Sequence, residues 1–198
     1  MIHPDTRLAD LGEPLGISLV AARRIPKGTV TWAHDPLDRI LPAAQVASLP
    51  ALFDSLTIRF AYRNAQGDYV LAWDDTRFMN HSCEPTCAMT RFGFEIALRD
   101  IEAGEQLTND YAMLHLESEE RIDCGCGYAL CRGAIRASDQ HGLQPVWDAW
   151  IDGALASFEA VDQPLSALLS RAQIRDAFAH YRLSADPATP HTRHAAPV

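Results

Sequence analysis

Short apolar and β-branched runs alternate with turn signals through the first two thirds of the chain. The clearest runs are Leu19–Ala21, Tyr69–Leu71 and Phe94–Leu98, and the turn signals are Pro26–Gly28, Gln66–Asp68 and Glu102–Glu105. This pattern predicts many short strands and little parallel βαβ architecture, so we expect a mainly β fold of the α+β class. The glycine-rich loops that hold nucleotides in Rossmann and Walker A sites are missing from the sequence.

The period of the pattern changes toward the C-terminus. Apolar residues recur near helical spacing at Trp147, Trp150, Ile151, Leu155 and Phe158, and again after Pro164 at Leu165, Leu168, Leu169 and Ala172. Because proline suits the first turn of a helix, we expect a second helix to begin at Pro164. The spacing predicts a helical region over 140–184, with both tryptophans packed inside it. Residues 185–198, rich in Ala and Pro, are expected to form a flexible tail.

The composition is that of a folded protein, with 47% hydrophobic and 22% charged residues among 198. There are 17 Lys and Arg against 26 Asp and Glu, and the resulting net charge of -9 opposes binding to nucleic acid and favours a basic partner. No apolar stretch approaches the roughly 18 residues of a membrane helix, and the first residues lack a secretory signal pattern. We expect a soluble intracellular protein without membrane contact, cytoplasmic, or nuclear if it is eukaryotic or delivered to a host cell.

Cysteines provide the first candidate chemistry. Of the five, Cys124, Cys126 and Cys131 lie in a glycine-bearing knuckle that lets several sulfurs face one point. A reducing compartment disfavours disulfides, and three thiolates leave a tetrahedral zinc site one ligand short. Cys83 and Cys87 are rival candidates for the fourth ligand, and neither His81 nor His115 is excluded on chemical grounds. The spacing therefore predicts a structural zinc ion that joins two distant segments.

Four stretches in a fixed order carry a resemblance to a known family. They are Gly16–Ala21 followed by Ile25–Gly28, then Arg77–Pro85 with its Asn-His-Ser-Cys motif, Gly104–Tyr111, and the knuckle Cys124–Gly133. In this combination the chain resembles SET-domain protein lysine methyltransferases, in the small single-domain form with a zinc-binding post-SET segment. The resemblance implies a SET domain over 12–117 and a post-SET zinc segment over 118–136. It also implies a knot-like core, in which the segment ending at Tyr111 threads the Asn-His-Ser-Cys loop.

The resemblance further implies S-adenosylmethionine as methyl donor and the side-chain amine of a lysine, in a basic protein or peptide, as acceptor. Tyr111 matches the catalytic tyrosine, which positions the amine beside the methyl group. The residues expected to bind the cofactor are Gly16, Ile17, Ser18, Arg77, Phe78, Asn80, His81 and Tyr111. The zinc ligands of the family select Cys83 over Cys87, so that the expected set is Cys83, Cys124, Cys126 and Cys131.

Three residues depart from the family pattern. Ser18 stands where a second glycine is usual, Thr86 where the motif usually ends in asparagine, and Asn109 where an aromatic often influences the number of methyl groups added. These departures support an alternative hypothesis, a zinc-stabilised SET-like module that binds basic peptides with weak or no catalysis. The acidic run Glu117–Glu120 could attract a lysine-rich peptide, although such runs are more often solvated surface.

Overall fold

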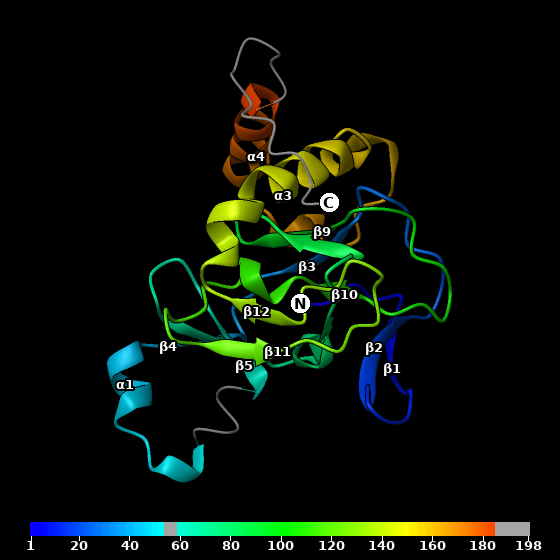
Figure 1. Ribbon diagram of the computed structural model, residues 1–198. Helices are drawn as coiled ribbons and strands as arrows, with labels where there is room; N and C mark the ends of the chain where they lie inside the picture. Colours follow the sequence, from blue (N-terminus) through cyan, green and yellow to red (C-terminus); the bar gives the residue numbers. More distant parts are fainter. Residues whose placement is uncertain (54–58, 185–198) are drawn as a thin grey trace.

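Short strands occupy most of the first 136 residues. The computed structural model describes residues 1–53 and 59–184, which Figure 1 traces in colour, so the expected tail at 185–198 lies outside the described residues. The strands are β1 (Thr6–Asp10), β2 (Ile17–Ala21), β3 (Val30–Ala33), β4 (Arg39–Leu41), β5 (Ala61–Arg63), β6 (Tyr69–Leu71), β7 (Asn80–His81), β8 (Cys87–Met89), β9 (Phe94–Ala97), β10 (Thr108–Asn109), β11 (Arg121–Asp123) and β12 (Ala134–Arg136). The α-helices are α1 (Ala43–Ala47), α3 (Asp139–Leu155) and α4 (Arg171–Ser184). Single 3₁₀ turns are η1 (Ala51–Phe53), η2 (Asp75–Phe78), η3 (Tyr111–Met113), η4 (Phe158–Ala160) and η5 (Ser166–Leu168).

The strands form several small sheets. β1–β2 and β11–β12 are antiparallel pairs, and β3–β9–β8 and β4–β6–β5 are antiparallel sheets of three strands. The three predicted runs fall in β2, β6 and β9, although β9 ends at Ala97, one residue before the end of its run. The predicted fold class, mainly β with a few helices, is confirmed.

One parallel pair joins two motifs that are distant in the sequence. β7 pairs with β10, so that Asn80 lies beside Thr108 and His81 beside Asn109. Further along, Thr86 and Thr108 exchange two hydrogen bonds. The Thr108 N–H donates to Thr86 Oγ1 at 2.8 Å, and the Thr86 N–H donates to Thr108 Oγ1 at 3.1 Å. The Asn-His-Ser-Cys segment and the segment that leads to Tyr111 therefore run side by side.

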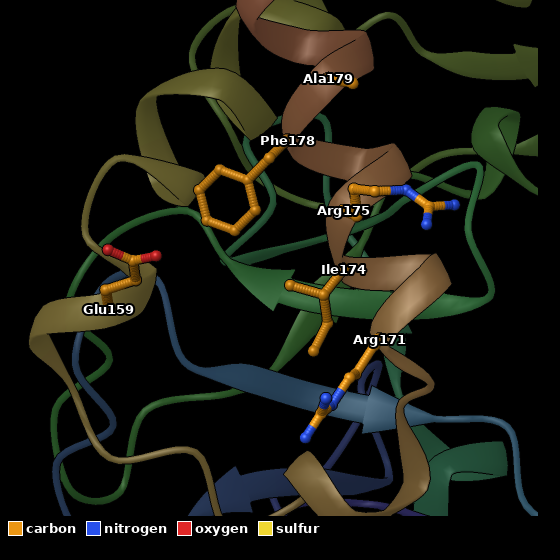
Figure 2. Close-up of a pocket in the computed structure, with 6 residues that line it drawn as sticks. All are labelled: Glu159, Arg171, Ile174, Arg175, Phe178 and Ala179. Atoms are coloured by element: carbon orange, nitrogen blue, oxygen red, sulfur yellow. The ribbon is translucent and has the colours of Figure 1, made fainter.

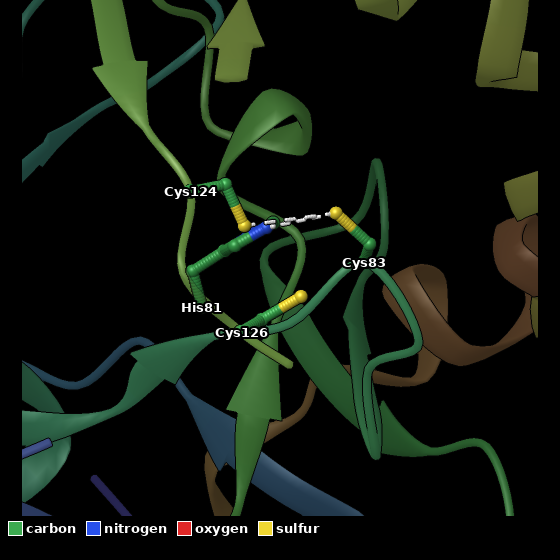
Figure 3. Close-up of side chains that lie close together, drawn as sticks. All are labelled: His81, Cys83, Cys124 and Cys126. Carbon is green, nitrogen blue, oxygen red and sulfur yellow. Dashed lines mark hydrogen bonds between the residues drawn. The ribbon is translucent and has the colours of Figure 1, made fainter. Parts of the chain in front are cut away.

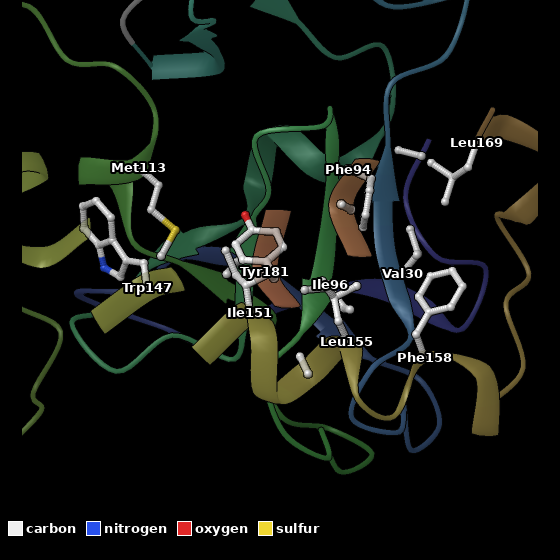
Figure 4. Close-up of a cluster of buried hydrophobic side chains, with 14 of the residues drawn as sticks. Val30, Phe94, Ile96, Met113, Trp147, Ile151, Leu155, Phe158, Leu169 and Tyr181 are labelled. Atoms are coloured by element: carbon white, nitrogen blue, oxygen red, sulfur yellow. The ribbon is translucent and has the colours of Figure 1, made fainter. Parts of the chain in front are cut away.

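The C-terminal helices form one wall of the larger hydrophobic core. Trp147, Ile151 and Leu155 of α3 are buried in one cluster with side chains of β3 and β9, and α4 adds Ala177 and Tyr181 (Figure 4). Trp147 is only 2% exposed, so it is a core residue, as its helical spacing predicts. The helices complete the core against the sheet β3–β9–β8, which we call the central sheet. The family resemblance did not extend to these helices.

The predicted start of the second helix at Pro164 is wrong. The chain forms the 3₁₀ turn η5 there, and α4 begins only at Arg171. The reason is tertiary. The Gln163 side chain accepts a hydrogen bond from the Val30 N–H and donates one to Gly28 O, which holds this loop against β3. Leu165 is in addition buried in the core.

Within the described ranges, no helix has the length and apolar composition needed to cross a membrane.

Candidate functional site

A cavity of about 560 Å³ lies between β5, β6, β11 and the turn that carries Tyr111. Its buried and half-buried wall is mainly apolar and aromatic, and includes Trp32, Tyr62, Met79, Met89, Leu114 and Leu116. The lining also contains exposed and half-buried charged residues: Arg59, Arg63, Arg77, Glu117, Glu119, Glu120 and Arg121. A concave, largely apolar site with a few polar groups is the usual form of a ligand pocket.

Tyr111 is held in this cavity at the start of η3. The carboxylate of Asp110 caps the turn by accepting a bond from the Ala112 N–H at 3.2 Å. The Tyr111 hydroxyl donates to Met79 O at 2.7 Å, and its backbone N–H donates to His81 Nδ1 at 3.2 Å. Burial, together with the nearby charge of Glu95, raises the pKa of Tyr111 to about 12, so the phenol stays protonated near neutral pH. This geometry suits a positioning role.

Glu95, which no sequence motif indicated, also lines the cavity. Glu95 lies in the buried strand β9 and is 3% exposed. Its Oε1 accepts a hydrogen bond from Asn109 Nδ2, whereas its Oε2 has no partner among the described residues. Burial raises the pKa of Glu95 to about 7, with the Asn109 hydrogen bond opposing the shift. The available signal was a charged residue inside the otherwise apolar run Phe94–Leu98.

A buried ion pair joins the tyrosine turn to the cysteine knuckle, and it too was missed. Asp110 is fully buried, and both of its oxygens accept bonds from Arg132, at 2.8 and 2.6 Å. Arg132 also lies 3.4 Å from the carboxylate of Asp139 at the start of α3. Two-point pairing between guanidinium and carboxylate fixes relative orientation as well as distance. The knuckle is therefore positioned directly against the turn that holds Tyr111.

Three of the expected zinc ligands converge with a histidine. The ligand atoms of His81, Cys83, Cys124 and Cys126 all lie within 4.8 Å of one another. Figure 3 draws these four side chains facing one another. Cys83 Sγ is 3.8 Å from Cys124 Sγ, and Cys131 Sγ is 3.5 Å from Cys124 Sγ. Cys131, the fourth expected ligand, is not in the group whose ligand atoms all lie within 4.8 Å of one another. A tetrahedral zinc site with Zn–S bonds of about 2.3 Å has sulfur–sulfur edges of about 3.8 Å. Both separations match such a site closely.

The hydrogen bonds of His81 bear on which group completes the site. Its Nδ1 accepts the Tyr111 N–H, so in the neutral ring the proton lies on Nε2, 3.4 Å from Cys83 Sγ. A protonated Nε2 cannot bind a metal ion. Burial lowers the pKa of His81, with Arg132 acting in the same direction and Asp110 opposing, which favours the neutral ring. The imidazole thus lies within the cluster, but with its proton on Nε2 it is not a metal ligand. Cys131, 3.5 Å from Cys124, is then the remaining candidate for the fourth ligand.

The remaining candidate ligands lie elsewhere. Cys87 is fully buried in the smaller core cluster beside Leu107 and Ala97, and burial, together with the Glu95 charge, raises the pKa of its thiol to about 12. His115 contacts Gln140 Nε2 at 3.4 Å and is not part of the cluster that the described residues form. The structure therefore brings Cys83, and not Cys87, to the knuckle.

The expected cofactor residues divide into two groups. Arg77 and Tyr111 line the cavity, whereas Gly16, Ile17, Ser18, Phe78, Asn80 and His81 are not among the described residues that line it. Asn80 Nδ2 donates to both Ser18 Oγ and Gln106 Oε1, at 3.2 Å each, and Ser18 Oγ donates to Gln106 Oε1 at 2.7 Å. Asn80 Oδ1 has no hydrogen bond within the part of the chain that is described. It remains able to accept one from a ligand.

A second hollow, of about 490 Å³, lies beside α4 (Figure 2). Its polar side chains, Glu159, Arg171 and Arg175, are all exposed, and its apolar lining includes Ile174 and Phe178. In contrast to the first cavity, none of its lining residues is a buried charged group. We therefore place the candidate site in the first cavity.

Comparison with known proteins agrees with this arrangement of motifs. The family profile described as the SET domain matches residues 16–112. Residues 16–112 are a SET domain. The match includes Asn80, His81, Cys83 and Tyr111 and ends at Ala112, 12 positions before the first cysteine of the knuckle. The predicted SET domain is confirmed over these residues.

Curated relatives share this SET domain over part of their length. Histone-lysine N-methyltransferase ash1 of Drosophila melanogaster is 40% identical over 73 residues, which cover 33% of this chain and 3% of the relative. The H3 lysine-36 specific histone-lysine N-methyltransferase of Schizosaccharomyces pombe is 29% identical over 146 residues, covering 68% of this chain and 18% of the relative. The chain thus spans a small fraction of both relatives. The methyltransferase domain of human SETMAR has a TM-score of 0.47 and 20% identity, over 67% of this chain and 57% of that one.

Within this SET domain, each departure from the family pattern has a polar partner. Ser18 is fully buried and bonds Gln106, and Thr86 is paired with Thr108. Asn109 donates to Glu95, although its own Oδ1 has no partner in the described part of the chain. Hydrogen bonds to nearby polar groups therefore accommodate Ser18 and Thr86. Asn109 instead forms its hydrogen bond with the Glu95 carboxylate, which lines the cavity.

Proposed function

We propose that the chain transfers a methyl group from S-adenosylmethionine to the side-chain amine of lysine in a protein substrate. One observation carries the proposal: the hydroxyl of Tyr111, fixed by Met79 O, lies on the wall of a large apolar cavity within a SET domain. The relatives, which are named histone-lysine N-methyltransferases, support this activity and a histone-like basic substrate.

The residues of this chain would act mainly by positioning. The Tyr111 hydroxyl donates its hydrogen to Met79 O, so its lone pairs are available to accept a bond from the substrate amine. The apolar wall disfavours the charged ammonium and lowers the proton affinity of the lysine, whose ordinary pKa is near 10.4. Bound S-adenosylmethionine would supply an electrophilic methyl group on a sulfonium. Alignment of the amine with that group is worth several kcal/mol.

The proposed cofactor site joins the backbone around Gly16 to the Asn-His-Ser-Cys segment. Gly16 has a φ of 62°, and no atom lies within 4 Å of the position of a Cβ there, so a ligand can approach its backbone closely. Ile17 and Ser18 follow it, Asn80 Oδ1 can accept from an amino group, and Arg77 and Phe78 extend the surface. Both ring nitrogens of His81 are engaged, which leaves its backbone for this role.

For the metal site we propose Cys83, Cys124, Cys126 and Cys131 as the zinc ligands. The donor set fits, because four thiolates form a closed structural site, and the Cys83–Cys124 and Cys124–Cys131 separations suit edges of a tetrahedron. Burial raises the pKa of Cys126, but backbone hydrogen bonds from Cys83 and Tyr128 and side-chain hydrogen bonds with Cys124 and Cys131 together lower it to about 7. The ion would hold the knuckle against the Asn-His-Ser-Cys segment and thereby shape the site.

The proposed partner is a basic, lysine-containing protein inside the cell, or in the nucleus if the protein acts in a eukaryote. The acidic run contributes three residues to the cavity lining: Glu117, Glu119 and Glu120. The first two are exposed and Glu120 is half-buried, so the run can contact an entering peptide. Glu117 is partly engaged by Arg63 at 2.7 Å. The expectation that no nucleic acid is bound stays a prediction.

Substitution of Tyr111 by Phe tests the proposal. Zinc-replete protein is incubated with S-[methyl-³H]adenosylmethionine and core histones, and label in lysine is measured. We expect Tyr111→Phe to lose about 100-fold in rate, because the amine loses its acceptor while the ring stays packed. The control, Tyr181→Phe, removes a hydroxyl from the helical core and should transfer at the wild-type rate.

Two outcomes would contradict this assignment. An unchanged rate in Tyr111→Phe would remove the tyrosine from the reaction. If the wild-type chain labels no protein and calorimetry shows no binding of S-adenosylmethionine, the activity itself is refuted, and a peptide-binding module remains.

A further inference from the structure

Four residues that line the main cavity, Trp32, Thr76, Glu95 and Asn109, each carry a buried polar atom without a hydrogen-bond partner among the described residues. These atoms are Trp32 Nε1, Thr76 Oγ1, Glu95 Oε2 and Asn109 Oδ1. Trp32 pairs with Glu95 in the register of β3 and β9. Native proteins rarely leave buried polar groups unpaired, because each costs about 1–3 kcal/mol. Their shared place in the lining of the cavity therefore points to a polar ligand.

The available atoms indicate the chemistry of that ligand. Glu95 Oε2 and Asn109 Oδ1 are acceptors, and the Tyr111 hydroxyl oxygen is a third, because its hydrogen is given to Met79 O. A group that donates several hydrogen bonds and carries positive charge would satisfy these three acceptors, and the ammonium group of a lysine has three N–H donors. Trp32 Nε1 is itself a donor, so an ammonium group leaves it without a partner. A carboxylate beside it also offsets the cost of burying that charge.

We propose that Glu95 is a catalytic residue that binds the lysine ammonium group in the cavity and removes its proton before methyl transfer. This inference rests on the function proposed above. Asn109 holds Glu95 Oε1, which leaves Oε2 for the amine, and Tyr111 accepts a second N–H. Tyr111 itself cannot serve as the base, because it is already a protonated phenol.

The proton balance of the step is simple. The lysine R–NH₃⁺ gives one proton to the Glu95 carboxylate, which leaves a neutral R–NH₂ and a carboxylic acid. The nitrogen lone pair then forms the N–C bond while the C–S bond of the sulfonium breaks, and a neutral thioether leaves. The product is R–NH₂⁺–CH₃, and Glu95 returns its proton to water when the product departs. No oxidant or other reactant is needed.

The surroundings of Glu95 are compatible with this role. Burial raises its pKa to about 7, while Asn109 from β10 and the amino group of Met1 oppose the shift. The charge of Glu95 also contributes to raising the pKa of three neighbouring groups, which are Tyr62 in β5, Tyr111 in η3 and Cys87 in β8. The register partners of Glu95 on the neighbouring strands, Trp32 in β3 and Met89 in β8, have no group that titrates. Glu95 is therefore the acid–base group that changes charge near neutral pH here.

The activity test compares Glu95→Gln with a matched control, Glu102→Gln, which changes an exposed carboxylate near the turn before β10. At pH 7.5 we expect kcat/KM of Glu95→Gln to fall about 100-fold and that of the control to stay at the wild-type value. The wild-type kcat/KM should rise through about pH 7 and then level off. The Gln variant should instead keep rising toward the lysine pKa near 10.4, because water must take the proton.

A second readout needs no turnover. In protein with ¹³C-labelled glutamate carboxyl groups, the resonance that is missing from Glu95→Gln identifies Glu95. At pH 8, n-butylammonium chloride, which imitates the lysine side chain, should shift this resonance, whereas n-butanol at the same concentration should not. If neither probe moves the resonance, water alone satisfies Glu95, and the inference is overturned.

The outcomes separate the two proposals. If wild type transfers methyl groups and Glu95→Gln does so equally well with the same pH profile, the inference fails and the methyltransferase function stands. A rate loss that high pH does not recover would assign Glu95 a structural role and also overturn the inference. If wild type transfers none but the Glu95 resonance responds to n-butylammonium, the cavity binds amines and the proposed reaction fails.

Discussion

At the scale of single residues, polar pairing explains why unusual side chains are tolerated in the SET domain. Three hydrogen-bonded pairs are found: Ser18 with Gln106, Thr86 with Thr108, and Asn109 with Glu95. In each case a buried polar group meets another, so the cost of removing it from water is largely recovered. The Asn109–Glu95 pair differs from the others, because it leaves two acceptors without partners at the cavity. The first two pairs are therefore structural, and the third is the functional candidate.

The Thr86 pair can be tested by an isosteric change. Thr86→Val keeps the shape but leaves the buried N–H of Thr108 without its acceptor, so we expect a loss of about 1–3 kcal/mol in the free energy of unfolding. The control is Thr29→Val, since Thr29 is 1% exposed and its hydroxyl has no partner in the described residues. That change should be neutral or slightly stabilising. Urea unfolding of both variants measures the difference, and equal losses would contradict the role given to Thr86.

At the scale of elements, the packing of α3 on the central sheet depends on one turn. Gly28, in the Pro-Lys-Gly turn before β3, has a φ of 88°, and a Cβ there would lie 2.8 Å from Ala154 O in α3 and 2.9 Å from Ser157. Both contacts are closer than real Cβ atoms approach. The turn was predictable from its sequence, but its use as a contact surface for a helix more than 100 residues later was not.

The turn provides a prediction with a natural control. Gly28→Ala must adopt a left-handed backbone and also displace the end of α3, whereas Gly104→Ala, at a φ of 86° with no atom within 4 Å, meets only the backbone penalty. We expect Gly104→Ala to lose about 1–2 kcal/mol of stability. Gly28→Ala should lose about 1–3 kcal/mol more, because it also overpacks a backbone contact. Thermal unfolding by circular dichroism gives both values, and equal destabilisation would show that α3 does not press on the turn.

At the scale of the whole molecule, two links tie the knuckle to the body of the SET domain. One is the sulfur cluster, which joins Cys83 to Cys124 and Cys126, and the other is the buried pair of Asp110 and Arg132. Both lie next to the Tyr111 turn. Loss of either link should therefore affect stability and the cavity together.

Two cysteine substitutions separate metal binding from core packing. Cys83→Ser should lose the zinc ion and lower the melting temperature by roughly 10 °C, since a structural zinc contributes several kcal/mol. Cys87→Ser places a hydroxyl in the apolar core, so it should lose stability while retaining one zinc per chain. Native mass spectrometry counts the metal, and calorimetric scans with and without a chelator measure its contribution. Zinc retained in Cys83→Ser, or absent from wild type, would refute the site.

Three of the short strands, β2, β6 and β9, together with the turns near them and the family motifs, were readable from the sequence. They depend on local signals, such as β-prone runs, positive-φ glycines and residues at fixed spacing, which neighbouring residues largely determine. The helical spacing of Trp147 and Ile151 was also sufficient to predict a core helix. The start of α4 was not predictable, because Gln163 and Leu165 respond to β3 and to the core and not to their own helical tendency.

Only the tertiary structure decided which distant groups meet. Spacing in the chain left Cys83 and Cys87 open, and folding brought Cys83 to the knuckle and buried Cys87 in the core. Glu95 and Asn109 are 14 positions apart and carry no shared motif, yet neighbouring elements bring them together at one cavity. Local propensity follows from each residue and its neighbours, but the pairing of buried polar groups depends on which surfaces exclude water together, and this is settled only when the chain has folded.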